Sequence, residues 1–149
     1  MRYHAAALTV AVASVLAACG SATTQSGTPP PPSASPTPTT VSCHVNLQFG
    51  GSIPGTDTST AHAQLTGSGQ NAAYSMDSSL VAADGNHAYT LAWRHASVSL
   101  TLETGEGSVS NPSGLTMSAD GRQTSFSDIS ITSQTATAGV ETISGQVSC

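Results

Sequence analysis

Apolar residues from Cys43 onward recur at every second position, the period of a β-strand with one buried face. They fall in short groups separated by clusters of Gly, Asn, Asp and Ser, which signal turns. The groups are Cys43, Val45, Leu47, Phe49; Ala61, Ala63, Leu65; Tyr74, Met76; Tyr89, Leu91, Trp93; Val98, Leu100, Leu102; Leu115, Met117; Phe126, Ile129, Ile131; and Ile143, Gly145, Val147, Cys149. The pattern predicts an all-β domain, either a small antiparallel β-sandwich or a partly closed barrel.

The phase of this alternation changes at two places. Apolar residues move from odd to even positions between Trp93 and Val98, and a strand cannot change phase without a turn or a bulge. We therefore expect a tight hairpin or a bulge over residues 94–97. A similar slip between Phe126 and Ile129 predicts a β-bulge.

The N-terminal segment is the part of the sequence that best indicates where the protein is located. A short apolar run follows Arg2 and ends in Leu16-Ala17-Ala18-Cys19, the layout of a secretory signal. A cysteine at its end is typical of a bacterial lipoprotein, because the thiol takes up a diacylglyceryl group before cleavage. The alternatives are an ordinary signal peptide with a chance cysteine or one membrane helix. About 20 apolar residues are needed to span, and Gly20 already begins a polar stretch. We expect a signal peptide over residues 1–18 and lipidation of Cys19.

Residues 19–41 are rich in Ser, Thr, Ala and Pro and have no apolar periodicity. Such composition predicts a disordered tether with a polyproline-II-like part, followed by a β domain over residues 42–149. The tether also suits O-glycosylation, with a bare linker as the alternative. The candidate acceptors are Thr23, Thr24, Thr28, Thr37, Thr39 and Thr40.

Charge is scarce and mostly negative. Charged residues make up 7% of the chain, against about 25% in typical soluble domains. Cleavage after residue 18 would leave two basic residues against eight acidic ones, a net charge of −6. Such a chain lacks the basic surface that nucleic acids or anionic head groups attract. We expect no nucleic-acid partner, and membrane attachment through the acyl chains alone.

Two cysteines remain once Cys19 is assigned to lipid. Cys43 and Cys149 are an even pair in an oxidising compartment, where a disulfide is the ordinary state and two free thiols are the alternative. Both take the inward phase of a terminal strand. The first and last strands can therefore be neighbours joined by this bond.

Short motifs in the domain resemble the mycobacterial nineteen-kilodalton lipoprotein antigen family. Val45-Asn46-Leu47-Gln48-Phe49-Gly50-Gly51 is similar to its first strand, and Asp120-Gly121 and Val147-Ser148-Cys149 are similar to parts of its final third. The chain departs from it in a longer stretch between the cysteines and in the segment from His87 to His95. The resemblance implies an envelope-anchored, glycosylated antigen that host lipopeptide receptors recognise, with no established catalytic role.

The sequence has only weak patterns for metal or ligand binding. Zinc and copper sites often place two histidines at i, i+2 on a strand or i, i+4 on a helix, and neither spacing occurs in the mature chain, whose histidines are His44, His62, His87 and His95. His44 and His62 take the polar phase of their strands, so we expect them to face solvent. Trp93 shares the phase of Tyr89 and Leu91, which favours core packing over ligand contact.

Catalytic motifs are equally weak, because the chain has no Gly-x-Ser-x-Gly elbow. Glu103 and Glu106 flank what reads as an exposed turn, where solvated charges are the ordinary interpretation. We expect no catalytic residues, no metal and no cofactor. The sequence favours a non-enzymatic lipid-anchored antigen. The alternatives are a binding module that holds a lipid or cell-wall glycan between its sheets, and a small metallo-enzyme with three converging histidines.

Overall fold

The computed structural model describes residues 36–132 and 139–149, and nearly all of this part of the chain is β-strand. The elements are β1 (Thr39–Gly50), β2 (Gly55–Asp57), β3 (Thr60–Thr66), the 3-10 turn η1 (Gly69–Asn71), β4 (Ala73–Ala82), β5 (Gly85–Arg94), β6 (Ser97–Leu102), β7 (Gly105–Ser110), β8 (Leu115–Met117), β9 (Gln123–Thr132) and β10 (Val140–Ser148). The predicted all-β class is confirmed.

The strands form one antiparallel sheet in the order β7-β6-β5-β4-β2-β1-β10-β9-β8. β3 continues β2 after a short interruption, and each of the two pairs with β1 on one side and β4 on the other. These four strands therefore form a closed ring of pairings. β1 also pairs with β10, with His44 opposite Ser148, so the sheet is an up-and-down meander in which these two strands are neighbours.

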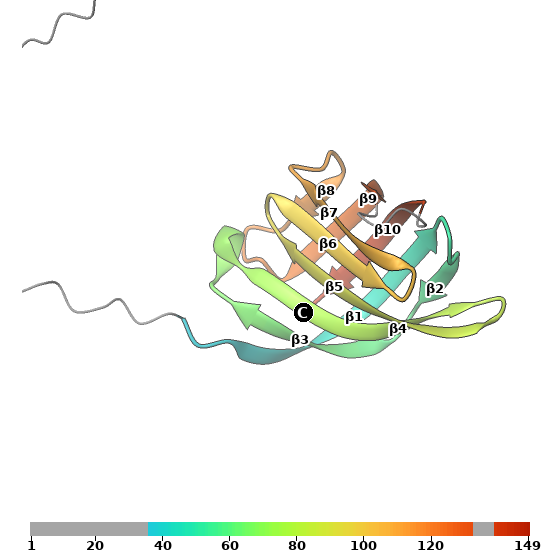
Figure 1. The fold of residues 1–149 in the computed structure, drawn as a ribbon. Coiled ribbons are helices and arrows are strands. Elements are labelled where there is room, and N and C mark those ends of the chain that lie inside the picture. Colours follow the sequence, from blue (N-terminus) through green and yellow to red (C-terminus); the bar gives the residue numbers. More distant parts are fainter. Residues whose placement is uncertain (1–35, 133–138) are drawn as a thin grey trace, which may run out of the picture. The chain divides into compact units, whose positions relative to one another are not determined.

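The sheet curls until β7 approaches β9 (Figure 1). Gly107 of β7 permits this approach, because a Cβ on it would lie 2.6 Å from Cγ2 of Ile131 and 2.7 Å from the carbonyl oxygen of Thr132. Any larger residue would push the two strands apart. The result is the partly closed barrel among the predicted alternatives.

Alternating side chains fill the barrel. The predicted inward positions of β1, β5 and β6 are all buried. At one end Trp93 stacks on Tyr74 with ring centroids 4.9 Å apart and meets Phe126 edge-on at 6.1 Å. The Trp93 indole N–H donates to Thr124 Oγ1 at 3.0 Å, and the Tyr74 hydroxyl donates to the carbonyl of Gly121 at 2.8 Å. Trp93 is therefore a core residue, as its phase predicted.

Both predicted phase changes correspond to real irregularities. β5 ends at Arg94 and β6 begins at Ser97, and the two residues pair across a tight hairpin. In β9, Phe126 and Ile129 lie opposite Gly145 and Ile143, so three residue steps face two. This β-bulge keeps both apolar side chains on the inner face.

β1 starts earlier than the predicted domain boundary at Ser42. Thr39, Thr40 and Val41 pair with Leu65, Gln64 and Ala63 of β3, so they belong to the sheet and not to the tether, and this part of the prediction is wrong. All three are β-branched residues that favour strands. Val41 also continues the inward phase of Cys43 and packs against the core.

The meander gives the barrel two distinct ends. We call the end at which β1 begins the tether end; it holds η1, the turn at residues 95–96, the turn at residues 118–122 and Cys149. The opposite, far end holds the loop at residues 51–54 and the turns at residues 83–84 and 103–104. Charged and covalent features divide between these two ends.

Candidate functional site

The predicted disulfide is present at the tether end. Cys43 and Cys149 form an S–S bond with their Cα atoms 4.0 Å apart and a sequence separation of 106. Cys43 is fully buried, and the backbone N–H of Cys149 donates to the carbonyl of Arg122 at 2.8 Å. The bond follows from the pairing of β1 with β10, which sets the two cysteines opposite each other.

The predicted modification residues divide between described and undescribed parts of the chain. Cys19, Thr23, Thr24 and Thr28 lie outside the described residues. Thr37, Thr39 and Thr40 are described and exposed. Thr39 and Thr40 lie within β1, and the Thr40 hydroxyl accepts a hydrogen bond from Gln64 at 3.0 Å, so a glycan on either would stand on a sheet and not on a flexible chain.

The described histidines lie on different parts of the barrel. His44 and His62 are exposed, as their phase predicted, and His44 Nδ1 lies 3.2 Å from Thr60 Oγ1. His95 is exposed in the turn between β5 and β6 at the tether end, whereas His87 lies on β5 at the far end. Among residues 36–132 and 139–149, no three His, Cys, Asp or Glu side chains come together as a metal-binding group.

His87 lies between two carboxylates from neighbouring turns of the far end, and its contacts with both connect these turns. Its Nε2 is 2.8 Å from Asp84 Oδ1, and its Nδ1 contacts Glu103 Oε1. The hydrogen bonds to Glu103 and then to Asp84 raise the pKa of His87 above its usual 6.5, and the bond from His87 lowers the pKa of Asp84. The sequence reading of Glu103 as an ordinary solvated charge missed this cluster. Its one signal was an Asp three residues before a His across a turn.

A buried carboxylate, nearer the far end, connects several elements by hydrogen bonds inside the barrel. Asp57 is 2% exposed, and its Oδ2 accepts hydrogen bonds from the hydroxyls of Tyr89 and Ser78, both at 2.6 Å. Its Oδ1 accepts from the backbone N–H of Ser59 at 3.0 Å. Burial, and then this carboxylate, raise the pKa of Tyr89 well above its usual 10. No pattern of residues around Asp57 marked it as buried.

A second buried acid, Glu141, lies at the start of β10. Its Oε1 accepts from the backbone N–H of Ser52 at 3.2 Å and from the Ser52 hydroxyl. Its Oε2 is buried and has no hydrogen-bond partner. The contact ties the 51–54 loop to β10. It is an internal contact. A Cβ atom added to Gly51 would lie only 2.5 Å from Glu141 Oε2, so there is no room for a ligand at this oxygen.

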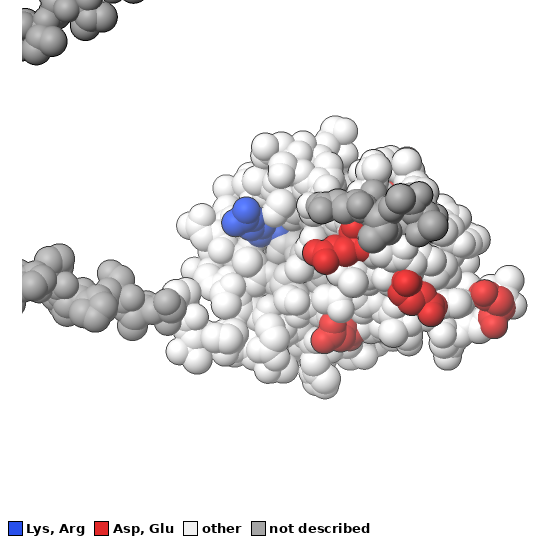
Figure 2. Space-filling model, in the orientation of Figure 1, with Lys and Arg blue, Asp and Glu red and all other residues white. Residues whose placement is uncertain are grey.

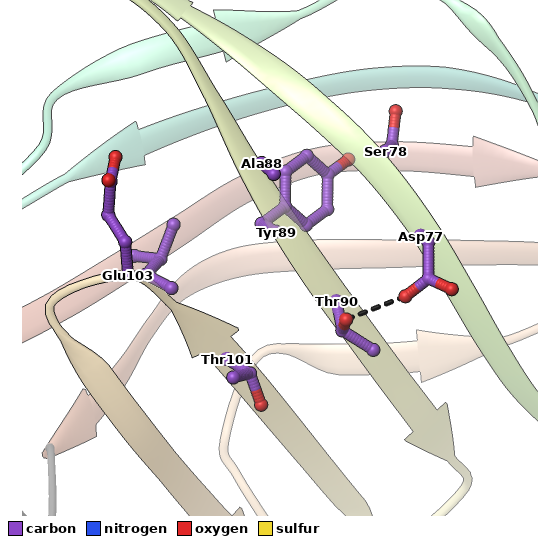
Figure 3. A pocket seen from close by; sticks show the side chains of 8 residues that line it. Asp77, Ser78, Ala88, Tyr89, Thr90, Thr101 and Glu103 are labelled. Carbon is purple, nitrogen blue, oxygen red and sulfur yellow. Dashed lines mark hydrogen bonds between the residues drawn. The ribbon is translucent and has the colours of Figure 1, made fainter.

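A surface depression of about 410 Å³ lies over β4, β5 and β6 (Figure 3). Exposed Asp77 and Thr101 and half-buried Thr90 line it, and the Thr90 hydroxyl donates to Asp77 at 2.6 Å. The Tyr89 hydroxyl is directed inward to Asp57 instead. The depression is therefore an open and mainly apolar surface to which Asp77, Thr90 and Thr101 add polar groups.

A comparison of the chain with protein-family models, with curated proteins and with solved structures finds no match. Within the part of the chain that the structure describes, no helix has the length and apolar character needed to cross a membrane. Functional inference therefore depends on the residues themselves.

Proposed function

We propose that this protein is a lipid-anchored lipoprotein of the bacterial cell envelope, of surface-antigen type and without enzymatic activity. The observation that carries the proposal is Leu16-Ala17-Ala18-Cys19 at the end of a short apolar run. The lipidated Cys19 holds the protein on the extracytoplasmic face of the cell membrane. Two or three acyl chains give firm attachment, since each buried methylene contributes about 0.8 kcal/mol.

The β domain supports a non-enzymatic role. Its interior is filled by apolar side chains, with Asp57 and Glu141 engaged in internal hydrogen bonds. The Cys43–Cys149 disulfide suits an extracytoplasmic location, because such bonds persist in oxidising compartments. The resemblance to the nineteen-kilodalton antigen family adds host lipopeptide receptors as partners of the acylated N-terminus.

A binding module remains the second candidate, and the surface depressions favour it over the metallo-enzyme. They reach volumes in the range of ligand sites, which is about 300–1,000 Å³. They are open to the surface, unlike the ligand space between sheets that the sequence suggested.

Expression in a lipoprotein-processing bacterium tests the anchor. Wild-type protein should partition into the detergent phase and carry a diacylglyceryl-modified Cys19 by mass spectrometry. Cys19→Ala should be unacylated and either released or left uncleaved, whereas Ser21→Ala, a neighbouring control, should behave as wild type. Membrane-bound, unmodified Cys19→Ala protein at the wild-type level would contradict the proposal.

A further inference from the structure

The charges of the barrel separate along its length. Both arginines of the described residues, Arg94 and Arg122, lie at the tether end, since Arg94 closes β5 and Arg122 precedes β9. The turn at residues 118–122 adds Asp120 beside Arg122, whereas the far end carries Asp84, Glu103, Glu106 and Glu141. On the face shown in Figure 2, the basic side chain lies toward the tether end and the acidic ones toward the middle and far end. A negatively charged ligand is therefore favoured at the tether end.

The two arginines are in different electrostatic positions. Asp120 lies beside Arg122, and the backbone N–H of Arg122 donates to Asp120 Oδ1 at 3.0 Å. The hydrogen bonds from Ser118 and from this N–H, and then the charge of Arg122, lower the pKa of Asp120. Arg94 donates from Nε to Ser97 Oγ at 2.8 Å. Within residues 36–132 and 139–149, no carboxylate forms an ion pair with Arg94. Its charge is thus not offset by a neighbouring acid.

Arg94 also lines a groove of about 340 Å³ at the tether end. Gln70, Asn71 and His95 line it as well, together with Ala72 and Ala96. The polar residues are exposed, whereas Ala72 is buried. Residues that carry two amides, an imidazole and a guanidinium thus line one groove, a combination that the outer depression over β4–β6 lacks.

We propose that this groove binds an acidic saccharide of the cell envelope, with the sugar carboxylate on Arg94. A guanidinium forms paired, charge-assisted hydrogen bonds with a carboxylate. The amides of Gln70 and Asn71 both donate and accept, which matches sugar hydroxyls. The inference goes beyond the proposed function: every residue involved belongs to the β domain, and only the choice of an envelope saccharide rests on the proposed location.

The structure of the groove explains why a saccharide fits better than a bare anion. The amide residues come from η1, whereas Arg94 and His95 come from the end of β5 and the turn that follows. A saccharide carries hydroxyls and a carboxylate on one molecule, so it can contact residues of both elements. A phosphate ion offers only a single charged centre.

Titration of the full chain with trigalacturonate, followed by calorimetry and by NMR of the Asn71 and Gln70 side-chain amides, tests the proposal. We expect binding of trigalacturonate and much weaker binding of the neutral trisaccharide maltotriose. Arg94→Gln should weaken binding about tenfold or more, since charge-assisted hydrogen bonds are lost. Asn71→Ala should weaken it less. Arg122→Gln is the matched control and should bind as wild type.

Several results would overturn the proposal. They are no amide shift at millimolar trigalacturonate, equal binding of maltotriose, equal binding of inorganic phosphate, or equal losses in Arg94→Gln and Arg122→Gln. Circular dichroism and a thermal melt of each variant show whether it is folded. If Arg94→Gln is unfolded, Arg94→Lys replaces it, and retention of full affinity by Arg94→Lys would contradict the paired contact with the carboxylate.

Discussion

The two ends of the barrel are held together by different chemistry. At the tether end a disulfide joins the first and last strands, and Tyr74, Trp93 and Phe126 pack as an aromatic group. Toward the far end, carboxylates make the ties between elements: Asp57 inside the barrel, Glu141 beneath a loop, and Asp84 and Glu103 on His87. The tether end is therefore held mainly by a covalent bond and apolar packing, whereas the far end is held mainly by hydrogen bonds to carboxylates.

This difference teaches how a chain with few charged residues distributes them. Of the eight acidic residues, two are buried as internal ties and two share one histidine. Much of the scarce charge is thus used within the fold. At the tether end Arg94 is the exception, which is why it is the residue that we assign to a ligand.

The largest effect is expected from opening the disulfide. Reduction, or Cys149→Ser, should lower the free energy of unfolding by about 2–5 kcal/mol, because the unfolded chain gains the freedom of a long closed loop. Chemical denaturation with and without reductant measures this change. Thiols that react freely in the native protein, or an unchanged melting temperature after reduction, would show that the tether end does not depend on this bond.

A smaller loss of stability is expected at the far end from Asp57→Ala. The hydroxyls of Tyr89 and Ser78 would lose their acceptor inside the barrel, which should lower the free energy of unfolding by about 2–4 kcal/mol. Asp77→Ala, an exposed acid on β4, is the matched control and should change it by no more than about 0.5 kcal/mol. Similar losses in the two variants would remove the distinction between internal and surface carboxylates.

The smallest effect concerns pH at the far end. The raised pKa of His87 means that protonated His87 stabilises the folded state fully below its unfolded pKa of about 6.5, and that this contribution is lost as pH rises through the folded value. The lowered pKa of Asp84 adds a contribution that is lost on acidification below about 3.8. The protection of amides in the turns at residues 83–84 and 103–104, measured as the exchange rate relative to the intrinsic rate at each pH, should therefore fall above neutral pH.

His87→Gln should abolish this pH dependence, and His62→Gln, an exposed histidine on β3, should leave it intact. NMR titration of the His87 ring measures its pKa directly. A pKa at or below 6.5 would contradict the bridge between the two turns.

Strand positions and strand irregularities could be predicted from the sequence because period-two alternation carries them directly. The hairpin at Arg94–Ser97 and the bulge after Phe126 both follow from keeping large side chains on one face. β2 and β7 were missed, because Gly55–Asp57 and Gly105–Ser110 contain small residues and no apolar alternation. β7 has glycine at its closest approach to β9, so the residue that closes the barrel is the one that weakens the strand signal.

The site residues could be predicted only where chemistry is local. The cysteine pair followed from compartment and phase, but the partners of Asp57 and His87 come from strands and turns that are distant in the chain. Arg94 and Asn71 approach each other only because η1 and the 95–96 turn share one end of the barrel. Such convergence depends on strand order, which alternation alone does not specify.

The position of the disulfide has a mechanical consequence. A pulling force applied to the chain before β1 reaches Thr39 and can peel only the few residues before Cys43, which pair with β3. The Cys43–Cys149 bond closes residues 44–148 into a covalent loop, so a force applied at the two cysteines or outside them cannot extend the strands from β2 to β10. Under the proposed lipid anchor, a load on the N-terminal segment would thus meet a covalently closed loop before it could unravel the barrel.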